Sequence, residues 1–462
     1  MRLARLLPAV IAVVIVAPAL AQDETVVGPD ARLKLDVTVY RDGFAHVRDV
    51  RTATLPEGPA RIAFAGVSDA LQPETAAVAA PGDAAQVLEQ AYEAALLSQQ
   101  ALLRAHVGKT IEVLTVNPAT GEESAVAAEV LAAEPEPILR IDGRVEPWNS
   151  GRLSFPGVPP GLRARPTLVA TLEGTPGDHA LALDYLTGGV GWSADYVVRA
   201  PGAGSLIELT LRATVRNDTD AAFDGATLAV IAGQVNRAVG GPVPLPRAAM
   251  AMAEAADVTP QPVGGAYRFQ VPRRVDLPAR TVKQFTLLTA PRVPFDIRYW
   301  LVGSPFASRP GSEPRPVQVA RQLEFINDEA SGLGTPLPAG VVRVYDHSTF
   351  IGEMTIDDVA EGGSVSVETG TVFGLTATRR VTDFRQEGPG GEIVESAHEF
   401  VFANSASSMT VVEVIEEIGG EWRILEEERS HKRLDAFRAR WTVAVPGNGT
   451  ATHTYRVRVE RR

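Results

Sequence analysis

The sequence predicts a mostly β protein of tandem antiparallel sandwich-like domains, with one helix near residues 84–106. Short apolar–polar alternations recur along the chain, and turn-forming residues separate them at intervals of roughly 8–12 residues. Only one stretch has the wider apolar spacing that is typical of an amphipathic helix. Because strands do not alternate with helices, we favour stacked antiparallel sheets over a parallel α/β sheet.

The first 21 residues have the pattern of a secretory signal peptide. Arg2 and Arg5 precede an apolar run at 6–17, and a small-x-small site ends at Ala21. The run is short, and prolines lie within it and directly after it, so a membrane span is not expected. The chain has no cysteine, which excludes a lipoprotein anchor, thiol chemistry and disulfides. We expect cleavage after Ala21, a periplasmic or secreted location and no transmembrane segment in the mature chain.

The region 22–80 is predicted to be a β meander. Alternating residues at 33–39 and 45–54 flank a turn at 41–43, and a second turn follows at 56–59. The next segment, within 81–108, is predicted to be the helix. Its apolar stripe consists of Val87, Leu88, Ala91, Ala95, Leu102 and Leu103.

Three further β regions are expected. The first, at 109–177, has a hairpin with its turn at 117–121. A central domain at 178–302 contains a long loop at 236–265 that is rich in Ala, Pro, Gly and Met. A C-terminal sandwich at 303–462 follows, and in it Gly419-Gly420 is predicted to join two strands as a hairpin.

The most informative stretch is 183–200, where two strands flank a glycine-rich corner. Glycines at 188, 189 and 191 permit a sharp turn that other residues would adopt only with strain. Trp192 follows at once, and we interpret it as a core residue rather than a sugar-stacking platform, because alternating apolar strands flank it. The next strand ends at the turn that starts with Asn217.

These residues resemble the domain of unknown function found in bacterial mucoidy-inhibitor-A-like proteins. The Gly-Trp-x-x-x-Tyr motif and the later Leu-Gly and Leu-Pro-x-Gly pattern within 325–345 carry the resemblance, which covers 181–462 and is weaker over 35–78. The motif residues are Gly191, Trp192, Tyr196, Asn217, Gly334, Pro338 and Gly340. Longer members have a coiled coil that this chain lacks. The resemblance brings no established catalytic residues, and we interpret the motif as structural.

Charge and glycine motifs exclude several classes of function. A net charge of −12 argues against nucleic acid and anionic membranes as partners. Gly189-x-Gly191-x-x-Ala194 fits a dinucleotide fingerprint, but a strand follows it where a helix is required. Gly108-Lys109-Thr110 lacks the first glycine of a phosphate loop. We therefore expect no cofactor.

The sequence gives little support for a metal site or for catalysis by carboxylates. The histidines are dispersed without metal-ligand spacing, so no metal site is expected: His46, His106, His179, His347, His398, His431 and His453. Four acids near a turn, Glu353, Asp357, Asp358 and Glu361, are interpreted as solvated rather than calcium-binding, since they lack the regular calcium-loop spacing. Whether acids from separate strands converge in space stays open.

The leading hypothesis is an exported, envelope-associated protein that acts as a non-catalytic interaction or structural module. It would bind another envelope protein or itself. The alternative is a periplasmic hydrolase or glycan-processing enzyme that uses carboxylates from separate strands. A glycan-binding module is a third possibility, but aromatic residues make up only 6% of the chain, which weakens it.

Overall fold

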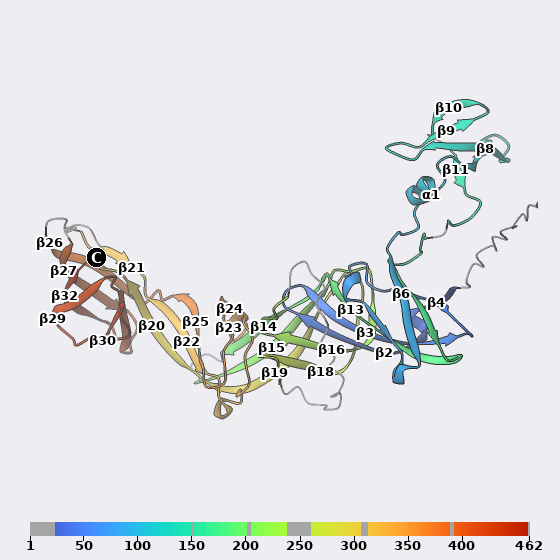
Figure 1. Ribbon diagram of the computed structural model, residues 1–462. Coiled ribbons are helices and arrows are strands. Elements are labelled where there is room, and N and C mark those ends of the chain that lie inside the picture. Colours follow the sequence, from blue (N-terminus) through green and yellow to red (C-terminus); the bar gives the residue numbers. More distant parts are fainter. Residues whose placement is uncertain are drawn as a thin grey trace, which may run out of the picture.

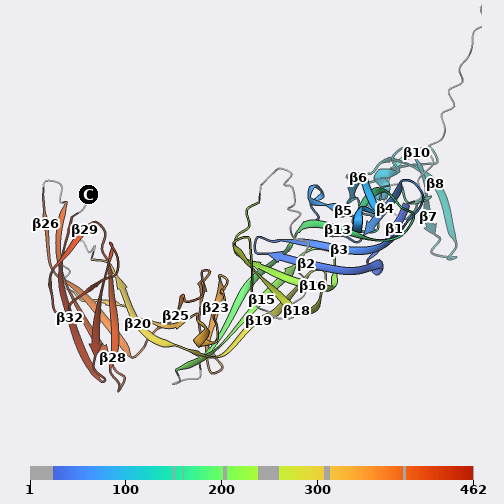
Figure 2. The same cartoon turned by 60° about the horizontal axis from the view of Figure 1, so that its bottom comes forward.

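The computed structural model describes residues 24–148, 151–159, 161–200, 205–237, 260–305, 313–388 and 392–460. It confirms the mostly β fold class. The sheets follow one another along an elongated molecule, with a C-terminal sandwich at one end and a small module at the other (Figures 1 and 2). The predicted signal peptide, and most of the loop predicted at 236–265, lie outside the described residues.

Two sheets form the N-terminal body. The seven-stranded sheet contains, in spatial order, β17 (Gln261–Val263), β18 (Ala266–Leu277), β16 (Phe223–Ala232), β2 (Arg32–Tyr40), β3 (Phe44–Leu55), β13 (Gly177–Gly188) and β5 (Ala77–Ala79). The four-stranded sheet contains β1 (Glu24–Val27), β4 (Ala60–Ala65), β12 (Thr167–Gly174) and β6 (Ala85–Glu93). The predicted β2–β3 hairpin is confirmed, but β4 leaves it for the second sheet.

A small module is inserted between β6 and β12, and it stands apart from the body in Figure 1. It consists of α1 (Gln99–Ala105) and a five-stranded sheet. The sheet order is β10 (Arg144–Pro147), β9 (Ile138–Ile141), β8 (Glu123–Ala132), β7 (Thr110–Val116) and β11 (Arg152–Ser154). The predicted hairpin of β7 and β8 is confirmed.

The single α-helix of the described residues lies within the predicted range but is shorter than predicted. The Ser98 hydroxyl accepts a hydrogen bond from the Ala101 amide and caps its start. The preceding segment, Ala85–Glu93, is strand β6, because its backbone pairs with β12 along its whole length. Tertiary pairing therefore overrides an apolar spacing that also fitted a helix.

The central sheet is built around β14. Its order is β19 (Thr281–Pro294), β15 (Leu206–Asn217), β14 (Val190–Ala200), β23 (Gly340–Asp346) and β24 (Thr349–Ile356). Strand β14 pairs antiparallel with β15 and parallel with β23. Residues from beyond position 302 therefore complete the sheet of the central region.

Two sheets form the C-terminal part of the molecule. One contains β25 (Ser364–Thr371), β22 (Ala320–Ile326), β20 (Asp296–Gly303), β28 (Thr410–Glu417), β31 (Arg438–Val445) and β30 (Lys432–Arg433). The other contains β21 (Arg315–Val317), β26 (Leu375–Glu387), β27 (Ile393–Asn404), β32 (Gly449–Glu460) and β29 (Glu421–Glu427). Short 3-10 helices occur at Pro29–Ala31, Pro73–Thr75, Pro81–Asp83 and Glu329–Ser331.

The predicted Gly419-Gly420 hairpin is wrong. Strand β28 pairs with β20 and β31, whereas β29 pairs with β32 in the opposite sheet. Gly420 has φ of 85°, and a Cβ there would lie 2.5 Å from the Glu460 carbonyl oxygen. The two glycines therefore carry the chain from one sheet to the other.

Separate cores stabilise these parts. The largest spans the N-terminal body and the central sheet and extends to β22 and β25. A second core fills the rest of the C-terminal sandwich, and a third of seven buried residues lies in the inserted module. Within the largest core, the fully buried Arg51 guanidinium donates to Asp49 and to the carbonyl oxygens of Val27 and Ala65. This arginine therefore joins the two N-terminal sheets.

The contact of β14 with β23 can be tested at one glycine. A Cβ at Gly340 would lie 2.2 Å from the Ala194 carbonyl oxygen, so Gly340→Ala should force the strands apart. We expect it to lower the free energy of unfolding by about 1–3 kcal/mol, measured by urea denaturation. Gly157→Ala is the matched control, because nothing lies within 4 Å of its Cβ position. Equal stabilities of the two variants would contradict the close approach.

Candidate functional site

The predicted motif residues meet inside the central core. The Tyr196 hydroxyl donates to the Pro338 carbonyl oxygen at 2.6 Å, and Gly340 packs against Ala194 on the neighbouring strand. Trp192 points inward as predicted, and its indole N–H donates to the Ile231 carbonyl oxygen at 2.9 Å. These contacts join segments far apart in the sequence and leave the side chains buried.

The remaining motif residues shape turns. The Asn217 amide donates to the carbonyl oxygens of Ala221, Leu277 and Pro278. Gly334 has φ of 67° and lies against Glu329, where a Cβ would be 2.8 Å from the Glu329 side chain. Gly191 packs on Gly43, with 3.1 Å between its Cβ position and the Gly43 Cα. All seven motif positions therefore have a structural explanation.

The four acids near the predicted turn do not form a cluster. Asp358 accepts from the Ala339 amide and pairs with Arg41, and Glu353 pairs with Arg343. Among the residues that the structure describes, no group of three or more His, Asp or Glu side chains could hold a metal ion.

A polar cluster that we did not predict lies between the sheets of the C-terminal sandwich. One terminal nitrogen of Arg379 lies 3.0 Å from Glu416 Oε2, 3.2 Å from His398 Nδ1 and 3.3 Å from the Tyr455 hydroxyl. Glu416 is fully buried, and His398 and Tyr455 are nearly so. The sequence signal was a polar residue at an inward position of an alternating strand. His398 is such a residue, two positions before Phe400 and four before Phe402 on the same face of β27.

Gly303 makes room for this cluster. A Cβ at this position would lie 2.8 Å from both Arg379 Nη1 and Glu416 Oε1. Burial raises the pKa of Glu416, although Arg379 opposes the shift. The arginine therefore offsets part of the cost of burying the glutamate, whereas its own side chain stays 13% exposed.

The cluster does not have the geometry of a serine–histidine–aspartate triad. His398 Nε2 lies 2.8 Å from the Ser396 hydroxyl, as in a serine–histidine pair, but Nδ1 faces the cation of Arg379 instead of a carboxylate. Burial, together with Arg379, lowers the pKa of His398 to about 3. An imidazole with this pKa is a weak general base, and Ser396 is buried.

His453 is the second buried histidine of the sandwich. Its ring packs near Trp441, Tyr455 and Phe400, with centroid distances of 5.4, 6.0 and 6.4 Å. Neither ring nitrogen has a hydrogen-bond partner among the described residues. Burial, with Arg429 nearby, lowers its pKa to about 4. The ring therefore packs as a neutral aromatic group.

Three loops meet at one end of the same sandwich, and we call this surface the loop end. They are residues 372–374, 405–409 and 446–448. The Ser405 amide donates to the Gly374 carbonyl oxygen and the Asn448 amide to that of Ala406, both at 2.7 Å. The buried Asn404 side chain donates to the Ser408 carbonyl oxygen at 2.9 Å. Hydrogen bonds within and between the loops therefore hold them in place.

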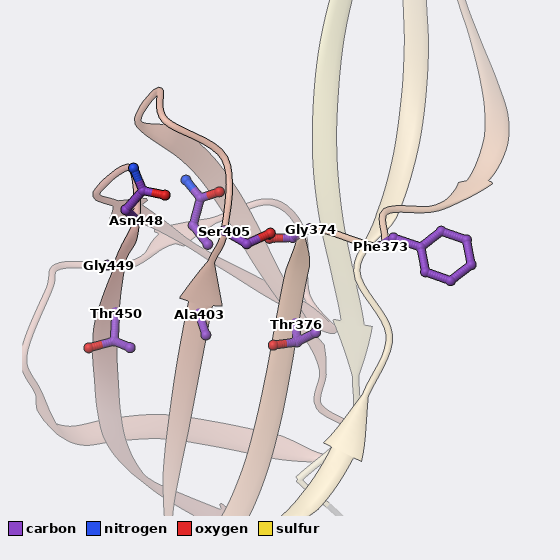
Figure 3. A pocket seen from close by; sticks show the side chains of 9 residues that line it. Phe373, Gly374, Thr376, Ala403, Ser405, Asn448, Gly449 and Thr450 are labelled. Atoms are coloured by element: carbon purple, nitrogen blue, oxygen red, sulfur yellow. The ribbon is translucent and has the colours of Figure 1, made fainter.

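The loop end carries exposed apolar side chains and no charge. Phe373 is 103% exposed and Met409 is 66% exposed. No charged residue occurs at 372–376, 403–410 or 445–450. A shallow pocket of about 430 Å³ lies beside the loops. Figure 3 shows Thr376, Ala403 and Thr450 side by side on neighbouring strands, while Phe373 points away from them.

The chain has no match in sequence among the known proteins with which it was compared. No family model matches the chain, and no curated protein matches it in sequence. In the described part of the chain, no helix is long and apolar enough to cross a membrane.

The buried histidines predict acid lability of the sandwich. Both folded-state pKa values lie below the ordinary value of about 6.5, so unfolding takes up protons and stability falls as pH drops below that value. Glu416, whose pKa is raised, has the opposite effect and offsets part of this loss. We expect the melting temperature of the sandwich to fall between about pH 7 and about pH 5.

His453→Phe tests this origin directly, because phenylalanine keeps an aromatic ring and removes one titrating group. The variant should lose less stability on acidification than the wild type, as measured by thermal unfolding across the same pH range. His347→Gln, at a side chain that is 73% exposed, is the control and should leave the pH dependence unchanged. Identical pH profiles for wild type and His453→Phe would contradict the assignment.

Proposed function

We propose that the protein is an exported, envelope-associated, non-catalytic interaction module, and that the loop end of its C-terminal sandwich binds another envelope protein. The signal-peptide pattern at 1–21 and the resemblance to mucoidy-inhibitor-A-like proteins support the location and the family. The observation that carries the proposal is the fully exposed Phe373 on loops that hydrogen bonds hold in place.

The geometry of the loop end favours protein recognition. A buried aromatic ring contributes a large apolar area, and aromatic residues are frequent among the side chains that dominate binding energy. Ser, Asn and Gly surround Phe373 and Met409, a composition that is common in binding loops of β sandwiches. Because the loops are already ordered, binding would cost little conformational entropy.

The absence of charge at the loop end limits the kind of surface that a partner can present to it. A charged partner residue that became buried here would lose its hydration and find no counter-ion on this surface. The matching surface should therefore be apolar or neutral polar. The polar cluster around Arg379 is buried within the sandwich, which supports a non-catalytic role over the hydrolase alternative.

Photo-crosslinking in living cells tests the proposal. A photoreactive residue replaces Met409 in the full-length chain, and adducts are identified by mass spectrometry. We expect one dominant adduct with a different protein, which Phe373→Ser should reduce strongly, because loss of a dominant side chain costs about 2 kcal/mol, roughly thirtyfold in affinity. Phe350→Ser is the matched control, since Phe350 is 52% exposed on the hairpin of β23 and β24.

Three outcomes would overturn the proposal. An adduct only with a second copy of the chain would indicate self-association, and adducts only with glycan would indicate a glycan-binding module. An adduct that is insensitive to Phe373→Ser in the folded protein would place the binding surface elsewhere.

A further inference from the structure

The inserted module is connected to the body through a narrow neck. Its chain leaves from β6 and returns to β12, which are neighbouring antiparallel strands. In the neck, the Leu97 amide donates to the Arg163 carbonyl oxygen at 2.8 Å, and the Arg163 amide donates to that of Ala95 at 2.9 Å. The hydrophobic core of the module shares no residue with that of the body. Apolar packing between the two cores therefore does not set the direction of the module.

Four charged side chains from separate segments meet at the base of this neck, and we call them the neck cluster. Glu24 lies on β1, Arg61 on β4, Glu93 at the end of β6, and Arg163 on the returning chain. Each arginine binds both glutamates. Arg163 lies 2.5 Å from Glu24 Oε1 and from Glu93 Oε2, and Arg61 lies 2.9 Å from Glu24 and 2.8 Å from Glu93.

The neck cluster is neutral and partly open to solvent. Its side chains are 19–35% exposed. The hydrogen bond from Arg163 is the main reason that the pKa of Glu24 is lowered, so the carboxylate is ionised at neutral pH. Both glutamates are therefore paired, and losing either arginine leaves their charges poorly compensated.

Strand β1 connects this cluster to the body. It has only four residues and pairs in parallel with β4 at the edge of its sheet. At one end, Val27 is buried in the body core and its carbonyl oxygen accepts from Arg51 at 2.8 Å. At the other end, Glu24 holds Arg163 of the neck. The strand thus links the most buried arginine of the body to the base of the module.

We propose that β1 is a strap that locks the inserted module in one direction relative to the body, with the neck cluster as the lock. When the cluster is intact, the returning chain of the neck is held against β1 and β4. When a charge of the cluster is removed, the module swings about the two neck segments while both cores stay folded.

Double electron–electron resonance tests the lock, and the absence of cysteine makes specific labelling straightforward. Spin labels are attached through Ala125→Cys in the module and Thr52→Cys in the body, both at exposed positions. We expect a narrow distance distribution for the otherwise unchanged chain. Arg163→Gln and Glu24→Gln should each broaden it, with roughly a doubling of its width for a module that moves independently.

Arg152→Gln is the matched control, because it removes an exposed arginine–glutamate pair within the module and should leave the distribution narrow. Unchanged thermal unfolding of the body shows that the variants are folded. If Arg163→Gln does not fold, Glu24→Gln alone tests the proposal. A narrow distribution in folded Glu24→Gln, or a distribution that is already broad in the unchanged chain, would overturn the proposal.

Discussion

The parallel pairing of β14 with β23 is the constraint on which the rest of the fold depends. It joins residues 194–200 to residues 340–346, and the buried hydrogen bond from Tyr196 to Pro338 fixes the register. On its other side β14 pairs with β15, which pairs with β19. Only Phe295 separates β19 from β20, so the central sheet leads directly into the C-terminal sandwich.

Buried polar groups hold layers together in both halves of the molecule. Arg51 with Asp49 joins the two N-terminal sheets, and Arg379 with Glu416 joins the two sheets of the sandwich. Each arginine is paired and hydrogen-bonded, as a charge in a protein interior requires. Both buried ion pairs therefore connect layers of the fold, whereas the exposed apolar side chains of the loop end lie on the surface.

Local features of the fold were predictable from the sequence, whereas long-range pairing was not. Turn residues located the β2–β3 and β7–β8 hairpins, and alternation placed Trp192 in the core. The apolar spacing of 84–93 fitted a strand as well as a helix, and pairing with β12 decided between them. Gly419-Gly420 had the local signature of a hairpin, but such a signature does not specify which sheet the next strand joins.

The loop end could not be predicted from the sequence, because it too depends on long-range strand pairing. Its loops are separated by about thirty to forty residues and meet only because β26, β27 and β32 are neighbours. Glu416 illustrates the limit for single residues. It is one of three glutamates close together in the sequence, with Glu413 and Glu417, yet it is a buried residue of β28 that meets Arg379 on the opposite sheet.

We propose that the motif of the central core stabilises the fold, whereas the loop end binds a partner. The most direct test of this proposal measures the free energy of unfolding and the Met409 crosslinking yield in one pair of variants, Tyr196→Phe and Phe373→Ser. The account predicts that Tyr196→Phe loses about 1–3 kcal/mol of stability and keeps the adduct, whereas Phe373→Ser keeps its stability and loses the adduct. Loss of the adduct in folded Tyr196→Phe, with the adduct retained in Phe373→Ser, would contradict it.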